Sequence, residues 1–318
     1  QSPRAQRWPL SADGHGDRSA RMARSADATR AGVQASSSLT SLQLSNNGVT
    51  YRGLRALARG VARVQTLREL DLGVNPLSAE GAHASHAHAS PPQRRRGMRS
   101  AFDGDGDDNG DSDGDDAWAE ERWEWPHATV AFGRVLSHLS RLQLLRMQYC
   151  HAGASLGGCV AAAMSGAALS SLNLQGSALT AQGLRALALA AEARGQQGVA
   201  VLNLEGCLRG ARDGVPEMLR WLAQPSCSVR RLNLGFNALC EEDILGLAEA
   251  IGRNVSLREL DLGSNVMTPR GVGALCKALG TSQLLALNLS YVKLGAEGGA
   301  HVAAALASGR CLLRALRL

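Results

Sequence analysis

The hydrophobic pattern of residues 257–271 is the unit that most of this chain repeats. Leu260 and Leu262 lie two residues apart, so both side chains point the same way from an extended strand. Asn265 follows where the strand turns, since its side-chain amide can bond the backbone groups that a turn leaves open. Thr268 can cap a helix, and Pro269 suits the first helical position. The segment therefore predicts one strand, one turn and one helix.

The same pattern opens nine segments of the chain, which are spaced by 27 to 30 residues except for one interval of 75. Their first core residues are Leu39, Leu67, Leu142, Leu169, Val199, Val229, Leu257, Leu284 and Leu313. A sustained period of this length is typical of a stacked array. We expect an α/β solenoid over 37–318, with about eight repeats and a final strand.

Two segments lack the repeat pattern. Residues 1–36 are rich in Arg, Ser, Ala, Gly and Asp, and we expect a disordered basic tail there. Residues 82–126 form a low-complexity acidic insertion that cannot bury a helix-period face. Phe132 and Leu136 precede Leu142 by ten and six residues, the offsets that Leu247 and Ile251 keep from the next repeat, so the interrupted helix should run over 127–139.

The consensus LxxLxLxxNxLxxxGxxxL, with a helix in every unit of 27 to 30 residues, resembles the leucine-rich repeat of the ribonuclease-inhibitor subtype. Similar repeats occur in NOD-like receptors and in Ran GTPase-activating protein. The resemblance implies a horseshoe with a parallel sheet inside and helices outside. It does not imply one activity, because function depends on the surface residues that the scaffold carries.

Charge and cysteine content bear on the partners and the compartment. The net charge is +6, but all basic residues except Lys277 and Lys293 are Arg, which does not point to nucleic acid. No apolar run approaches the ~20 residues that span a bilayer, so we expect no membrane partner. Seven Cys is an odd number, and Cys150 and Cys207 occupy the turn position of Asn265, so they should be buried structural thiols in a cytoplasmic protein. An N-x-S triplet at Asn254 leaves a secreted protein as the alternative.

The insertion contains a run that matches the spacing of a calcium-binding loop. Asp105, Asp107, Asn109, Gly110, Asp113 and Asp116 stand at its positions 1, 3, 5, 6, 9 and 12. A tract this rich in Asp produces such a match easily, so a solvated acidic linker is the ordinary interpretation. Motifs for phosphate binding, zinc proteases and serine hydrolases are missing from the sequence. We therefore expect no enzyme, cofactor, metal or small-molecule substrate.

Residues between the core leucines of each strand should face the concave side of the solenoid. One such row reads Gln43, Asp71, Arg146, Asn173, Asn203, Asn233, Asp261 and Asn288. Its asparagines predict a ladder of amides that bond one another across the strands.

Large side chains on or near this surface are of the types that form binding hot spots. The predicted partner-binding residues are Arg146, Tyr149, Arg231, Phe236, Glu259, Asp261 and Tyr291. We predict a non-enzymatic scaffold that binds a protein partner through its concave face. The alternative is a GTPase-activating regulator resembling Ran GTPase-activating protein.

Overall fold

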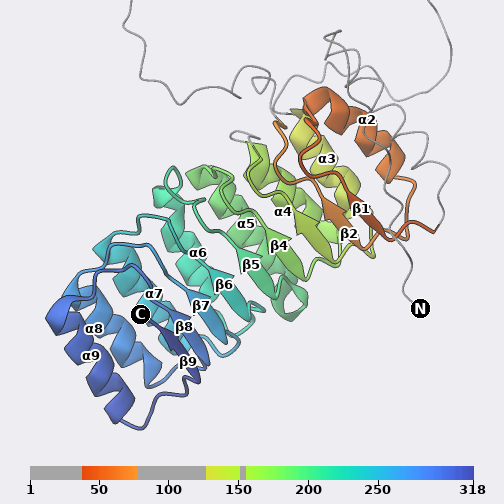
Figure 1. Ribbon diagram of the computed structural model, residues 1–318. Helices are drawn as coiled ribbons and strands as arrows, with labels where there is room; N and C mark the ends of the chain where they lie inside the picture. The colour runs from red at the N-terminus through yellow and green to blue at the C-terminus, as the bar shows by residue number, and fades with distance from the viewer. Residues whose placement is uncertain (1–37, 78–126, 151–154) are drawn as a thin grey trace, which may run out of the picture.

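The structure is a computed structural model that describes residues 38–77, 127–150 and 155–318 (Figure 1). The predicted basic tail at 1–36 and the predicted insertion at 82–126, with its calcium-loop spacing, lie outside the described residues. The segment before Leu142 is described, and the helix predicted over 127–139 runs from His127 to Ser137.

Nine short strands form one parallel sheet in which each strand pairs with the next one along the chain. The strands are β1 (Ser41–Gln43), β2 (Glu69–Asp71), β3 (Leu144–Arg146), β4 (Ser171–Asn173), β5 (Val201–Asn203), β6 (Arg231–Asn233), β7 (Glu259–Asp261), β8 (Ala286–Asn288) and β9 (Ala315–Arg317). Their central residues are all leucine and pair in register, as Leu232, Leu260 and Leu287 do on β6, β7 and β8. The predicted strand positions are therefore confirmed.

One helix follows each of the first eight strands and packs on the same face of the sheet (Figure 1). The α-helices are α2 (Tyr51–Val61), α3 (His127–Ser137), α4 (Leu156–Gly166), α5 (Ala181–Arg194), α6 (Val215–Leu222), α7 (Glu241–Arg253), α8 (Pro269–Leu279) and α9 (Gly295–Ala307), with the 3-10 turns η4 (Gly195–Gln197) and η5 (Arg212–Gly214). The Thr268 hydroxyl accepts a hydrogen bond from the Gly271 amide at 3.1 Å, which confirms the predicted cap of α8.

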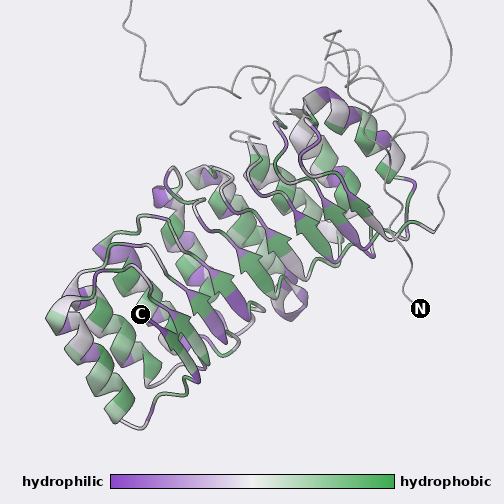
Figure 2. Cartoon of the chain, in the orientation of Figure 1, coloured by the Kyte–Doolittle hydropathy of each residue, from purple (hydrophilic) through white to green (hydrophobic). Residues whose placement is uncertain are grey.

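A continuous core fills the space between the sheet and the helices. Figure 2 shows hydrophobic positions recurring along the stacked strands and in the helices that cover them. Leu232, Leu260 and Leu287 are buried, and each lies between leucines of the neighbouring strands. Each coil therefore completes the core of the coils on either side, as expected for a solenoid.

Buried amides tie each turn to the preceding repeat. The Asn265 side chain donates to the carbonyl oxygens of Leu234 and Leu262 at 2.9 and 3.0 Å, and it accepts from the backbone amides of Asn237 and Leu239 at 3.1 and 3.2 Å. These bonds satisfy backbone groups that a buried turn would otherwise leave without partners.

The predicted role of the cysteines at this turn position is confirmed. The Cys150 thiol donates to the Leu72 carbonyl at 3.2 Å, and the Cys207 thiol donates to the Leu174 carbonyl at 2.8 Å. Both thiols are buried, and burial raises the pKa of each to about 12. They are neutral hydrogen-bonding parts of the core.

Replacing Leu260 with Asp should destabilise the solenoid severely. The side chain is only 3% exposed, so the substitution places an unpaired charge in the core and should cost more than about 4 kcal/mol. Urea denaturation followed by circular dichroism measures the change. Val266→Asp, at an exposed position of the same repeat, is the matched control and should change stability little. Equal denaturation midpoints for Leu260→Asp and the parent would contradict the core assignment.

Stability should also fall at high pH because of the buried thiols. The pKa of Cys150 is raised from 9.0 to about 12 in the folded state, so its contribution is complete below about pH 9 and is lost as the pH rises toward 12. Unfolding free energies measured between pH 8 and 11 should decline less steeply in Cys150→Ser. Serine is tolerated at this turn position, since Ser177 occupies it in the next repeat. An unchanged pH slope in that variant would oppose the prediction.

Candidate functional site

The open face of the sheet, which no helix covers in the described residues, carries the two outer residues of each strand. On β6, Leu232 is buried while Arg231 is exposed and Asn233 is half-buried on the opposite side. This alternation follows from the period of two along a strand. The same two rows therefore continue from repeat to repeat across the sheet.

The seven predicted binding residues fall into two groups. Arg146, Arg231, Glu259 and Asp261 lie on strands and belong to the open face. The three aromatic residues Tyr149, Phe236 and Tyr291 lie on turns, each three residues beyond the end of its strand. The aromatic group therefore borders the edge of the sheet at which the strands end, and not the face itself.

A shallow open groove of about 340 Å³ crosses the open face from β5 to β9. Its lining includes Val201, Arg231, Glu259, Ala286 and Ala315 from one row, and Asn203, Asn233, Asp261, Asn288 and Arg317 from the other. Three predicted residues are thus brought together in the groove. Arg146, on β3, is not among the residues that line it.

An ion pair occupies the middle of the groove. The Arg231 Nε lies 3.0 Å from Glu259 Oε1, and the two side chains are 62% and 49% exposed. Exposed pairs of this kind contribute little to stability, typically below about 1 kcal/mol. The pair therefore presents both charges to solvent and to any molecule that enters the groove.

The predicted ladder of asparagine amides is wrong. The side-chain oxygens of Asn173, Asn203, Asn233 and Asn288 each accept a hydrogen bond from the backbone amide two residues later, at 2.9 to 3.0 Å. The strand ends at these residues, so each side chain closes a local turn instead. Two of the amides also donate across repeats, and both do so to carboxylates: Asn233 to Glu205 at 3.0 Å, and Asn288 to Asp261 at 2.8 Å.

The three aromatic residues adopt a backbone conformation that is unfavourable for them. Tyr149, Phe236 and Tyr291 have φ values of 52°, 60° and 62°, whereas glycine fills the same turn position as Gly176 and Gly206. A left-handed conformation costs a residue with a side chain roughly 1 to 2 kcal/mol. The three side chains are nevertheless 49%, 54% and 86% exposed, so little packing compensates for the strain.

Two contacts of these rings could not be found by reading the repeat pattern. A Cβ atom at Gly176 would lie 2.3 Å from the Tyr149 ring, so the ring occupies space that only glycine leaves free. The Arg209 guanidinium carbon lies 5.1 Å from the centre of the Phe236 ring, within the range of a cation–π contact. Both partners lie in the neighbouring repeat, where only the register of the coils brings them close.

The described residues offer no alternative chemical centre. Among them, no group of three or more His, Cys, Asp or Glu side chains is placed to hold a metal ion. No helix in the described ranges has the length and apolar character needed to cross a membrane.

Comparison with known proteins supports the repeat assignment. A family model described as Leucine Rich repeat matches residues 35–58, 65–84 and 253–276. No curated protein matches the chain. A crystal structure of an internalin from Listeria monocytogenes is similar with a TM-score of 0.35 and 14% sequence identity, covering 92% of this chain and 88% of that chain. That likeness is too distant to carry a functional argument. The nine parallel strands, their alternating helices and the matched repeats make this fold a leucine-rich-repeat solenoid.

Replacing Tyr291 with Gly should stabilise the protein. The φ of 62° is strained for tyrosine and free for glycine, and the ring is 86% exposed, so we expect a gain of about 1 kcal/mol. Tyr291→Ala is the control because it removes the ring and keeps the strain, and its stability should stay near that of the parent. Chemical denaturation measures both variants. Greater destabilisation by glycine than by alanine would contradict the assigned strain.

Proposed function

We propose that this chain is a non-enzymatic scaffold that binds a protein partner across the groove on β5 to β9. The observation that carries the proposal is the exposure of Phe236 and Tyr291 in strained turns directly after β6 and β8, two strands that line the groove. Residues held at an energetic cost without compensating packing indicate a functional constraint. Tyrosine, arginine and other large side chains on a rigid surface are typical anchors of protein interfaces.

The shape and composition of the groove favour a macromolecular ligand. It is open along five strands and is floored by arginine, carboxylate, amide and small apolar side chains. Small-molecule sites are usually enclosed and bury most of their ligand in apolar surroundings. A broad, mixed and rigid surface better suits the side chains of another protein.

We further infer the ribonuclease-inhibitor subtype and a cytoplasmic setting. The repeat length of 27 to 30 residues and the helix in eight described repeats support the subtype. All seven cysteines are free, which is typical of a reducing compartment. The glycosylation triplet at Asn254 lies on a buried side chain that donates to the Leu222 carbonyl, which disfavours the secreted alternative. Nothing in the described residues favours the GTPase-activating alternative.

The proposal is tested by combining Arg231→Ala with Phe236→Ala in the full chain. Affinity capture followed by mass spectrometry first identifies the principal partner, and its affinity is then measured by calorimetry. Loss of both side chains should weaken binding by about 2 kcal/mol or more, roughly 30-fold, if they are hot spots. Stability should change little, because both side chains are exposed.

Arg185→Ala and Glu249→Ala are matched controls on the helical face. Both side chains are exposed and form ion pairs, Arg185 with Glu217 and Glu249 with Arg253. They should leave the affinity unchanged. If the controls abolish binding while the groove variant binds normally, the helices carry the interface and the proposed site is wrong.

A further inference from the structure

Three arginines line the edge of the sheet at which the strands begin. Arg230, Arg258 and Arg314 directly precede β6, β7 and β9. Their backbones form a ladder: the Arg258 amide donates to the Arg230 carbonyl at 2.8 Å, the Leu285 amide donates to the Arg258 carbonyl at 2.7 Å, and the Arg314 amide donates to the Leu285 carbonyl at 2.7 Å. We call Arg230, Arg258 and Arg314 the arginine edge. It lies opposite the edge that carries the aromatic turns.

The arginine edge is not neutralised within the described residues. None of its three guanidinium groups forms an ion pair there. The Arg258 Nη1 instead donates to the carbonyl oxygens of Val255 and Leu257 at 3.0 and 3.1 Å, which fixes the side chain and leaves other donors available.

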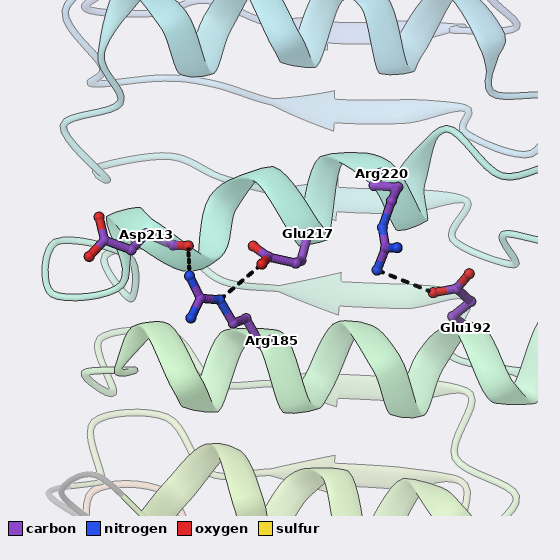
Figure 3. Close-up of polar contacts among 5 residues, drawn as sticks. All are labelled: Arg185, Glu192, Asp213, Glu217 and Arg220. Atoms are coloured by element: carbon purple, nitrogen blue, oxygen red, sulfur yellow. Dashed lines mark hydrogen bonds and ion pairs between the residues drawn. The ribbon is translucent and has the colours of Figure 1, made fainter.

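Arginines on the helical face have a different arrangement. Figure 3 shows Arg185 Nε 3.0 Å from Glu217 Oε1, and Arg220 Nη2 4.0 Å from Glu192 Oε2. Arg253 and Arg270 also pair with glutamates, at 2.6 and 3.0 Å. The helices therefore compensate many of their own charges, whereas the arginine edge leaves its charges for an external group.

Such a ladder has a physical cost in the isolated protein. Neighbouring strands lie only about 4.8 Å apart, so Arg230 and Arg258 place like charges on adjacent rungs. Like charges at directly opposed positions of a sheet are destabilising. An anion that contacts both rungs would relieve this repulsion, and arginine forms bidentate pairs with carboxylates and phosphates.

The surroundings of the arginine edge favour carboxylates of a protein over phosphates of a nucleic acid. Val255 and Leu312 are exposed aliphatic residues in the loops that lead to β7 and β9. Glu259 and Asp261 lie on β7, immediately after Arg258, and would repel a phosphate backbone. The exposed aromatic residues that could stack on bases lie at the opposite edge.

We infer that the arginine edge binds an acidic protein segment that also carries aliphatic side chains. Its carboxylates pair with Arg230, Arg258 and Arg314, and its aliphatic groups cover Val255 and Leu312. This inference deepens the proposed function, on which it rests insofar as the ligand is a protein. It assigns to the partner a second contact that is independent of the aromatic turns.

Fluorescence anisotropy with a labelled peptide of four Glu-Gly-Leu repeats tests the inference on the full chain. The variant Arg230→Gln, Arg258→Gln, Arg314→Gln should bind this peptide roughly tenfold or more weakly than the parent. The charge-matched control Arg185→Gln, Arg220→Gln, Arg253→Gln should stay within about twofold of the parent, since those residues lie on helices. A thermal melt checks folding, and if Arg258→Gln destabilises the chain, the double variant at Arg230 and Arg314 takes its place.

Three outcomes would overturn the inference. Equal binding of a peptide with Gln in place of Glu would exclude carboxylate recognition. Equal losses in both triple variants would indicate general charge attraction. Tighter binding of a single-stranded oligonucleotide that depends on the same three arginines would make the edge a nucleic-acid site.

The peptide measurement also separates this inference from the proposed function. The groove variant Arg231→Ala, Phe236→Ala should retain peptide binding, because the peptide needs only the arginine edge. If the peptide binds as expected while the captured partner ignores the groove variant, only the groove assignment fails. If the partner requires the groove while the peptide does not bind, only the arginine edge fails.

Discussion

Burial of the strand leucines against neighbouring coils is the interaction on which this structure depends. A three-residue strand cannot bury a leucine by itself, and Leu260 is buried only because β6 and β8 place Leu232 and Leu287 beside it. Register is thereby fixed, since a shift of one residue would turn every leucine toward solvent. Everything on the surface of the sheet inherits its position from this core.

Polar bonds at the turns reinforce the same stacking. Asn265 joins its own turn to the backbone of the previous repeat, and Cys150, Ser177 and Cys207 make comparable bonds where asparagine is replaced. These side chains differ in size and donor strength, yet each donates to a carbonyl of the preceding repeat. The requirement at this position is a buried hydrogen-bond donor, which several residue types can meet.

The surface shows the opposite tendency, because several features there cost stability. Tyr149, Phe236 and Tyr291 occupy left-handed turn positions that glycine fills elsewhere, and the arginine edge aligns like charges on adjacent rungs. A repeat built only for stability would have glycine at these turns and opposite charges along the edge. The two unfavourable features lie at opposite edges of the groove and are consistent with one partner that spans the open face.

The leucine spacing alone determined the solenoid, its repeat boundaries and the buried role of the turn cysteines. These features depend on local periodicity, which one repeat displays as clearly as nine. The tertiary structure decided the contacts between repeats. The amides of the Asn row bond backbone N–H groups and carboxylates instead of one another, the Tyr149 ring covers Gly176, and three arginines align without acidic partners. The physical reason is that each of these contacts depends on backbone conformation at a turn or on a residue almost a full repeat away. The hydrophobic period fixes which residues lie at the same height, but only the folded chain decides which atoms meet.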